Sequence, residues 1–212
     1  MTNSELKERI TDTLTLLQVP GIGKGRFNRL IQRFGSASNA LGATVHEIEA
    51  VPGLSHALAT AIRSQADPAA AREIAARIVQ LGWAVLFPES TDYPVALSRI
   101  ADPPPILFRL GEPAQIDDKL VAIVGTRHAS ERSRHFTAKL AGDLARAGIT
   151  VVSGMAEGID SAAHAGALDA GGKTIAVWGT SLDIVYPPTN RKLAERIAQH
   201  GAVYSEYPPA TS

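Results

Sequence analysis

Three stretches of the sequence decide the fold, and they read Leu120-Val-Ala-Ile-Val-Gly125, Ile149-Thr-Val-Val-Ser-Gly154 and Thr174-Ile-Ala-Val-Trp-Gly179. Each is a short apolar run that ends in glycine. Residues 131–147 and 159–170 lie between them and have helical apolar spacing. Short apolar strands that alternate with helices are typical of βαβ units, whose parallel sheet is buried on both faces. The three stretches therefore predict an α/β fold with a buried parallel sheet.

The pattern of expected helices and strands changes at about residue 67. Residues 1–66 contain short helical segments that are interrupted by Pro-Gly and by single glycines, which predicts a small all-helical domain. Asp67 and Pro68 have the residue types of a helix start, and strands follow this helix. We therefore expect a helical domain at residues 1–66 and an extended α/β domain at residues 68–212.

Composition excludes several classes of protein. The 212 residues include 21 basic and 21 acidic side chains and no cysteine. Disulfide frameworks and thiolate zinc sites are thereby excluded, whereas a local basic patch is not. The charged N-terminus has no signal-peptide core, and no apolar run approaches the roughly 20 residues that span a bilayer. We expect a cytoplasmic protein that has no membrane partner, metal or cofactor.

The carboxyl ends of the three strands form a candidate site. In a parallel sheet these ends lie along one edge, where open α/β sheets bind their ligands. The Arg127 side chain could hold a phosphate with two parallel hydrogen bonds. The candidate phosphate-binding residues are Gly125, Thr126, Arg127, Arg134, Ser153, Gly154, Gly179 and Thr180. A glycine at a strand end can also simply form a tight turn, but three such ends beside an arginine favour an anion site.

The helical segment contains a repeat that resembles the helix-hairpin-helix motif. Val19-Pro-Gly-Ile-Gly23 recurs as Val51-Pro-Gly-Leu-Ser55, each copy between two short helices. Glycines let the backbone approach a phosphate, and the following helix directs unpaired N–H groups toward it. The candidate phosphate-binding residues of the first copy are Gly21, Gly23, Lys24, Gly25 and Arg26. Either copy could instead be a packing turn, and this interpretation is favoured for the second copy, which lacks Lys and Arg.

Catalysis has weak support in the sequence. Asp160 and His164 are four residues apart, so they share a helix face and could form an acid–base or metal pair with Glu157 nearby. The favoured alternative is that Asp160 begins the helix and that His164 packs or hydrogen-bonds locally. The chain lacks a P-loop motif, and Gly125 lacks dinucleotide-site spacing. Aromatic residues are scarce, which indicates binding through phosphates with little base preference.

Four blocks of sequence resemble the DprA/Smf family, the DNA-processing proteins of natural transformation. They occur in the family's order from about residue 83 to the end, and the helical N-terminal segment also suits the family. The blocks are Tyr93-Pro94 with Asp102-Pro103-Pro104, Val121 to Arg127, Ser153 to His164, and Gly179 to Pro187 with Ser205 to Pro208. The resemblance implies an extended Rossmann-like fold preceded by a tandem helix-hairpin-helix domain.

The same resemblance implies a function. It implies binding and protection of single-stranded DNA without hydrolysis, and the recombinase RecA as a partner that is loaded onto this DNA. It places Gly125, Thr126 and Arg127 in the DNA pocket, with Arg127 on a phosphate. Family members continue beyond Ser-Glu-x-Pro with further strands and a self-association surface. We therefore expect a sheet that is incomplete at its C-terminal end, so that homodimerisation and RecA loading do not follow for these 212 residues.

Two other functions stay open. The sheet could belong to an enzyme or sensor for a nucleotide-derived small molecule, because related Rossmann-like sheets include phosphoribohydrolases. Alternatively, the helical domain could bind duplex DNA while the sheet acts as a scaffold.

Overall fold

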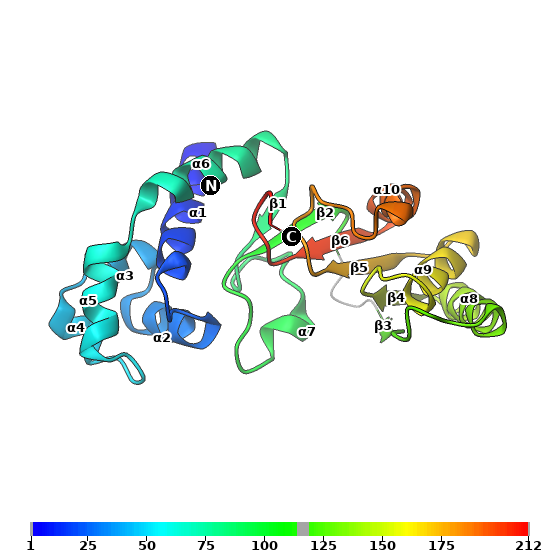
Figure 1. Ribbon diagram of the computed structural model, residues 1–212, viewed down its shortest axis with the longest axis horizontal. Helices are drawn as coiled ribbons and strands as arrows, with labels where there is room; N and C mark the ends of the chain where they lie inside the picture. Colours follow the sequence, from blue (N-terminus) through cyan, green and yellow to red (C-terminus); the bar gives the residue numbers. More distant parts are fainter. Residues whose placement is uncertain (1, 114–118, 212) are drawn as a thin grey trace. The chain divides into compact units, whose positions relative to one another are not determined.

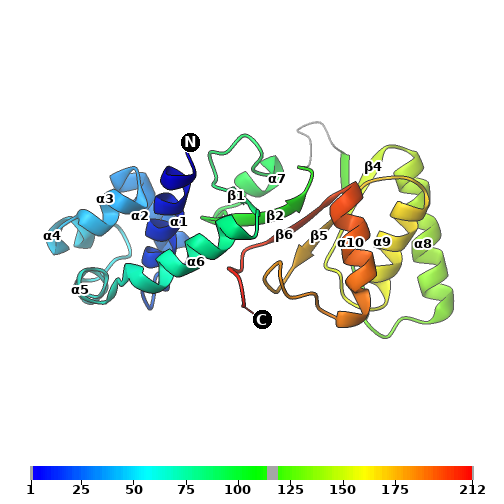
Figure 2. The same cartoon turned by 90° about the horizontal axis from the view of Figure 1, so that it is seen from above.

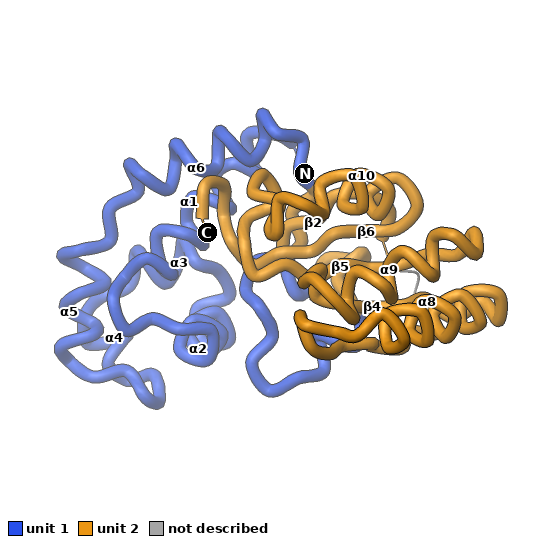
Figure 3. Tube along the Cα trace, turned by 45° about the vertical axis from the view of Figure 1, so that its right-hand side comes forward, with its two compact units in different colours: residues 1–83, 87–89, 95–106 blue, residues 84–86, 90–94, 107–212 orange. Residues whose placement is uncertain are grey.

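The computed structural model describes residues 2–113 and 119–211 and separates into two compact units, shown in Figure 3. Unit 1 comprises Met1–Trp83, Phe87–Glu89 and Val95–Ile106, and unit 2 comprises Ala84–Leu86, Ser90–Pro94 and Leu107–Ser212. In the described segments, every helix is too short or too polar to cross a bilayer.

Unit 1 consists of helices and connecting turns (Figure 1). Capping boxes begin two of its helices, because Thr2 and Thr44 each exchange hydrogen bonds with a glutamate three residues later. Its helices are α1 (Asn3–Gln18), α2 (Lys24–Phe34), α3 (Ala37–Gly42), α4 (Val45–Glu49), α5 (His56–Gln65), α6 (Pro68–Gln80) and α7 (Val95–Ser98).

The core of unit 1 contains the apolar residues of the repeated hairpin. Val19 and Ile22 of the first copy and Val51 and Leu54 of the second are all buried in one cluster with Leu16, Leu30 and Ile62. The repeat therefore shapes the packing of the helices as well as their turns.

The compact units divide the chain differently from the expected boundary at residues 66–68. Helix α6 packs on α1 and belongs to unit 1. Its Ala71, Ala75 and Ile78 recur at helical spacing and are buried, so α6 covers α1 with an apolar stripe. The start predicted for this helix is confirmed, because the Asp67 side chain accepts a hydrogen bond from the Ala69 N–H and Pro68 opens the helix.

Unit 2 is built on one mixed sheet of six strands, whose spatial order is β1-β2-β6-β5-β4-β3. Strands β3 to β6 are parallel, and β1 and β2 extend this sheet in antiparallel fashion beyond β6. The strands are β1 (Ala84–Leu86), β2 (Leu107–Gly111), β3 (Lys119–Ala122), β4 (Ile149–Ser153), β5 (Thr174–Trp178) and β6 (Ala202–Ser205). The predicted α/β, Rossmann-like fold is thereby confirmed, and the parallel part corresponds to the alternating region of the sequence.

Three long helices connect the parallel strands. They are α8 (Glu131–Arg146), α9 (Ile159–Asp169) and α10 (Arg191–His200), with a 3-10 turn at Pro188–Asn190 before α10. Helix α9 lies between α8 and α10 and contacts both (Figure 2). The approach of α9 to α8 requires glycine, because a Cβ on Gly166 would lie 2.1 Å from the Ala138 carbonyl oxygen.

The first predicted strand of the alternating region differs from expectation. Residues 120–124 were expected to form a buried strand, but β3 is Lys119–Ala122 and all four of its residues are exposed. The physical reason is its position, because β3 is an edge strand and its described strand neighbour is β4 alone.

Candidate functional site

The carboxyl ends of β3 and β4 are joined through Asp160, the second residue of α9. Asp160 is buried, and its carboxylate accepts hydrogen bonds from the N–H groups of Gly125, Gly154 and Ala156 at 3.3, 3.2 and 3.4 Å. A Cβ on Gly154 would lie 2.9 Å from Asp160 Oδ2, so a side chain at this position would displace the carboxylate. The predicted gathering of strand ends at one edge is therefore present.

The same contacts change what these ends can bind. The sequence suggested that glycine N–H groups at this edge would receive a phosphate. Two of those donors, on Gly125 and Gly154, already donate to the Asp160 carboxylate. A phosphate at this edge must therefore be held mainly by other groups.

The loop between β4 and α9 is conformationally constrained. Met155 is buried with φ of 68°, a value that residues other than glycine rarely adopt. Its carbonyl oxygen accepts a hydrogen bond from the Asn190 side-chain amide at 2.9 Å. Gly158 has φ of 85°, and a Cβ there would lie 2.4 Å from the Thr126 carbonyl oxygen. These contacts hold the loop after β4 close to the loop after β3.

A cavity of about 490 Å³ opens beyond the ends of β4 and β5. This volume falls within the roughly 300–1,000 Å³ of typical ligand sites. Its walls come from the loops after β3, β4 and β5, and the residues that line it are Arg127, Gly154, Ala156, Glu157, Trp178, Gly179, Thr180, Tyr186 and Pro187. We call this space the strand-end cavity.

Arg127 is the charged donor of the strand-end cavity. The side chain is exposed, and no described carboxylate lies within ion-pair distance of its guanidinium. An exposed, unpaired guanidinium at a ligand cavity can bind a phosphate bidentately.

The other candidate residues divide into two groups. Gly154, Gly179 and Thr180 line the strand-end cavity with Arg127, and Gly125 and Thr126 lie in the exposed loop that leads to Arg127. Ser153 and Arg134 do not line this cavity. Ser153 is buried, and its hydroxyl donates to the Ile123 carbonyl oxygen at 2.6 Å. Arg134 donates to the Ala129 carbonyl oxygen and lines a separate groove over α9.

Three further side chains line the strand-end cavity, and the sequence had pointed to one of them, Glu157, only as part of a possible acid–base or metal group. Tyr186 is 60% exposed, and Glu157 is exposed at the cavity wall. The indole of Trp178 is buried, and its N–H has no hydrogen-bond partner among the described residues. The Tyr186-Pro187 pair within the family-like block at Gly179 to Pro187 was the only sequence signal for this part of the wall.

His164 has the structural role that the sequence favoured. It is completely buried, and its Nδ1 lies 2.7 Å from the Thr174 hydroxyl oxygen. Burial lowers the pKa of His164 to about 4, with a smaller opposing contribution from a hydrogen bond to the Ser153 backbone. Asp160 binds the loop N–H groups instead, so the two side chains are not arranged as an acid–base pair.

The two hairpins of unit 1 adopt the same turn. In the first copy the Ile22 N–H donates to the Val19 carbonyl at 3.0 Å, and in the second the Leu54 N–H donates to the Val51 carbonyl at 3.1 Å. The central glycines have φ values of 90° and 80°. The repeated sequence motif therefore forms the same turn in both copies.

The basic residues of the first hairpin are partly engaged within unit 1. The Arg26 guanidinium donates to the carbonyl oxygens of Gly21 and Gly53, at 2.7 and 3.0 Å, and so connects the two hairpins. At the amino end of α2, a Cβ on Gly25 would lie 2.9 Å from Asp102 Oδ1. A carboxylate therefore already occupies a place that favours anions. The space beside Gly23 is open, because a Cβ placed on this residue would meet no described atom within 4 Å.

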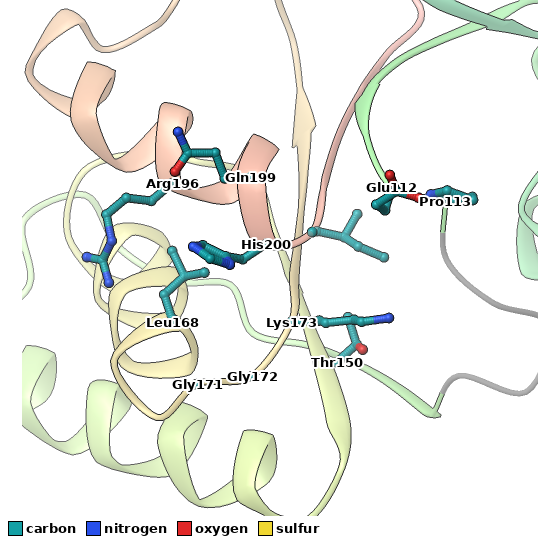
Figure 4. A pocket seen from close by; sticks show the side chains of 12 residues that line it. Glu112, Pro113, Thr150, Leu168, Gly171, Gly172, Lys173, Arg196, Gln199 and His200 are labelled. Atoms are coloured by element: carbon teal, nitrogen blue, oxygen red, sulfur yellow. The ribbon is translucent and has the colours of Figure 1, made fainter.

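A second cavity in unit 2, of about 390 Å³, lies at the opposite end of the strands (Figure 4). Thr150 and Ile175 line it near the amino ends of β4 and β5, together with Lys173 and His200. The carboxyl ends of α9 and α10 also border this cavity, and they carry partial negative charge. Arg196 in its wall is paired with Asp169 at 2.7 Å. An anion is therefore less favoured here than in the strand-end cavity.

Comparisons with known proteins cover both units. A family model described as DNA recombination-mediator protein A matches residues 84–212, and a model described as DprA-like N-terminal HHH domain matches residues 7–76. Protein Smf of Synechocystis is 38% identical over 195 residues, which are 90% of this chain and 49% of that protein. The chain spans half or less of the length of the curated relatives it matches.

Two solved structures are similar. The X-ray structure of DNA processing protein A from Streptococcus pneumoniae matches with a TM-score of 0.76 and 30% identity, covering 100% of this chain and 70% of that one. DNA processing protein A from Helicobacter pylori, whose structure is described as showing a single-stranded DNA binding mode, matches with a TM-score of 0.55 and 37% identity. The second match covers 61% of this chain and 58% of the other.

Proposed function

The chain belongs to the DNA recombination-mediator protein A family, and on this premise we propose that it binds single-stranded DNA at the strand-end cavity, without cutting or joining it. Arg127 holds a backbone phosphate at the mouth of the cavity. The observation that carries this proposal is the exposed Arg127 guanidinium, which has no described carboxylate partner and lines an open, ligand-sized cavity. The Helicobacter pylori relative, with its single-stranded DNA binding mode, supports the choice of ligand.

A non-catalytic role fits the side chains that could have done chemistry. Asp160 organises three loop N–H groups, and His164 is buried on Thr174. Neither side chain is presented to a ligand in the strand-end cavity. We therefore propose binding and protection of DNA strands as the activity, with delivery to RecA and homodimerisation added by family resemblance alone.

The hairpins of unit 1 have a supporting role in this proposal. Arg26 connects their carbonyl groups. The second copy has no Lys or Arg between Pro52 and Ile62, and its His56 lies 3.0 Å from the Glu49 carboxylate. Duplex binding by unit 1 therefore has less support than strand binding by unit 2.

The test is a binding titration of the whole chain with a fluorescent mixed-sequence oligonucleotide, single-stranded or duplex. Arg127→Ala should weaken single-strand binding about tenfold or more, because a charged hydrogen bond contributes roughly 1.5–3 kcal/mol. It should also reduce the slope of log affinity against log salt by about 0.7, since one phosphate contact is lost.

Arg146→Ala is the matched control. It removes the same charge from α8, at a residue that is paired with Asp143 at 2.6 Å and lies outside the strand-end cavity. Equal affinities of Arg127→Ala and the unmodified chain, or an equal loss in Arg146→Ala, would contradict the proposed site.

The ligand-sized cavity also favours one alternative, a nucleotide-derived small molecule as substrate or signal. Incubation with the four nucleoside monophosphates distinguishes the two functions. Release of free base would establish the enzyme, and unchanged nucleotides together with strand binding would establish the binder.

A further inference from the structure

We propose that a cavity of unit 1, bordered by α1, α5 and α6, binds a small molecule through a terminal phosphate group. The cavity has a volume of about 580 Å³, within the roughly 300–1,000 Å³ of typical ligand sites. All residues that line it belong to unit 1, and none of them lines the strand-end cavity. We call this space the helix cavity. It is a separate site, and the inference does not depend on the proposed function.

Helix α1 presents a polar stripe to the helix cavity. The residues of this stripe recur at intervals of three to four positions, so they share one face of the helix, and they are Ser4, Lys7, Thr11 and Thr15. Thr11 and Thr15 are buried, although a helix face that packs against other helices is usually apolar. The polar residue types on this face therefore need a reason other than packing.

The hydroxyl of Thr15 is the observation that points to a ligand. One turn earlier, the Thr11 hydroxyl donates to the Lys7 carbonyl oxygen at 2.8 Å. Thr15 is 2% exposed, and its hydroxyl has no hydrogen-bond partner among the described residues. A buried hydroxyl without a partner destabilises a fold, and such groups are rare in native proteins. A ligand oxygen that accepts this hydrogen bond would explain why threonine, rather than valine, stands at this position.

Three cations indicate that the ligand is an anion. Lys7, Arg63 and Arg72 come from three different helices and line the helix cavity, and no described carboxylate lies within ion-pair distance of them. The Arg63 guanidinium donates to the Leu41 carbonyl oxygen, which holds this side chain at the cavity wall. Arginine binds phosphate oxygens with parallel hydrogen bonds, and lysine adds a point charge. The wall therefore suits a phosphate group.

Two carboxylates limit the charge of the ligand. Glu8 and Asp12 line the helix cavity, but both also border a neighbouring cavity that none of the three cations lines. Burial raises the pKa of Asp12, and a hydrogen bond with Ser38, on the wall of that neighbouring cavity, opposes this rise. Three cations against two carboxylates leave the wall with one net positive charge, which suits a single phosphate group. The carboxylates can accept hydrogen bonds from hydroxyl groups elsewhere on the ligand.

A terminal phosphate fits this cavity better than the phosphate of a DNA strand. A phosphodiester has a sugar on either side, whereas a terminal phosphate has three free acceptor oxygens and can enter a cavity end-on. Only an end-on group approaches a hydroxyl as buried as that of Thr15. The expected ligand is therefore a phosphate monoester of a small polar molecule, either a sugar phosphate or a mononucleotide.

The test is isothermal titration calorimetry of the whole chain with ribose 5-phosphate and with ribose, which differ only in the phosphate. Ribose 5-phosphate should bind in the millimolar range or more tightly, and ribose should give no binding heat. Arg72→Gln should weaken binding about tenfold or more, because a charged hydrogen bond is lost. Arg77→Gln is the matched control, since it removes the same charge from α6 outside the helix cavity and should bind like the unmodified chain.

A parallel titration with dAMP distinguishes the two sources of the phosphate. Tighter binding of dAMP would identify a mononucleotide, and tighter binding of ribose 5-phosphate would identify a sugar phosphate. Either result supports the site. If the unmodified chain binds neither compound, the site is refuted, whatever the result for DNA.

Thr15→Val distinguishes a ligand contact from a structural role, because its two effects should have opposite signs. The thermal unfolding midpoint of the ligand-free chain should rise by about 2–4 °C, since a buried hydroxyl is no longer unsatisfied. The affinity for the phosphate monoester should fall about three- to tenfold, since one neutral hydrogen bond is lost. Unchanged affinity in Thr15→Val, or equal affinities of Arg72→Gln and Arg77→Gln, would overturn the proposal.

The strand-end cavity is tested separately. Arg127→Ala should bind ribose 5-phosphate like the unmodified chain, and Arg72→Gln should bind single-stranded DNA like the unmodified chain. Loss of ribose 5-phosphate binding in Arg127→Ala would place the ligand in the strand-end cavity. That result would refute the site in unit 1 and leave the proposed function standing.

Discussion

At the scale of single residues, Asp160 determines how the loops of the site are held. One buried carboxylate receives three backbone N–H groups from two loops. Family-like motifs in the sequence mark this position, but they do not say that it competes with a ligand for the same donors. The residue thus stabilises the site and at the same time removes two predicted phosphate contacts.

Replacing Asp160 should therefore destabilise the fold. In Asp160→Ala three N–H groups lose their acceptor, and a loss of roughly 2–4 kcal/mol in the free energy of unfolding is expected. Urea denaturation of the whole chain measures it, with the exposed Asp143→Asn as a control that should unfold like the unmodified chain. An unchanged unfolding midpoint for Asp160→Ala would mean that water replaces the carboxylate at no cost.

His164 predicts a pH dependence of stability. Its pKa is about 4 in the folded chain and 6.5 when exposed, so between these values the unfolded chain binds more protons. Stability should therefore fall as the pH decreases from about 6.5 to 4, by up to about 3 kcal/mol from this group. Denaturation curves at several pH values should show a shallower decline in His164→Gln. Identical pH profiles for the two proteins would rule out this contribution.

At the scale of elements, the repeated hairpin is a packing device in which glycines turn the chain and Arg26 joins the two turns. Arg26→Ala should lower the free energy of unfolding of unit 1 by about 1 kcal/mol, because two partly exposed hydrogen bonds are lost. DNA affinity should be unaffected. Parallel urea and binding titrations, with Arg33→Ala as the control for charge, separate these effects. A weaker affinity at unchanged stability would show that Arg26 contacts phosphate, as its sequence position suggests.

At the scale of the whole molecule, unit 2 has an exposed edge strand, β3, and several exposed apolar side chains in and after β3 and on α8. Val124 is 73% exposed and Phe136, on α8, is 66% exposed. Leu120, Val121 and Leu140 are exposed as well. Exposed apolar edge strands are prone to pair with other chains.

We therefore expect the chain to self-associate at increasing concentration. Light scattering over a range of concentrations should show a rise in mean mass, and Val121→Lys, which places a charge on the edge, should reduce it. Constant monomer mass for the unmodified chain would show that this apolar surface stays unpaired in solution.

The sequence predicted the helices, strands and turns of the molecule better than it predicted which polar groups are free to bind a ligand. Alternating strands, the glycine at each strand end and the repeated hairpin all follow from local patterns, and the structure contains them. The prediction that residues 120–124 are buried was wrong, because the burial of a strand depends on how many neighbouring strands it has. The positions of Glu157 and Tyr186 on the wall of the strand-end cavity had no distinct pattern, since each lies in an irregular loop and reaches the cavity only through folding.

By itself, the sequence determined that apolar strands alternate with helices and that Arg127 follows the first of them, because hydrophobic period and glycine position act over a few neighbouring residues. Parallel pairing then places the strand ends along one edge. Only the tertiary structure decided which groups at that edge remain available, since Asp160 takes the Gly125 and Gly154 donors from 35 and 6 residues away. A hydrogen-bond partner is chosen by proximity in space, which the order of residues along the chain does not specify.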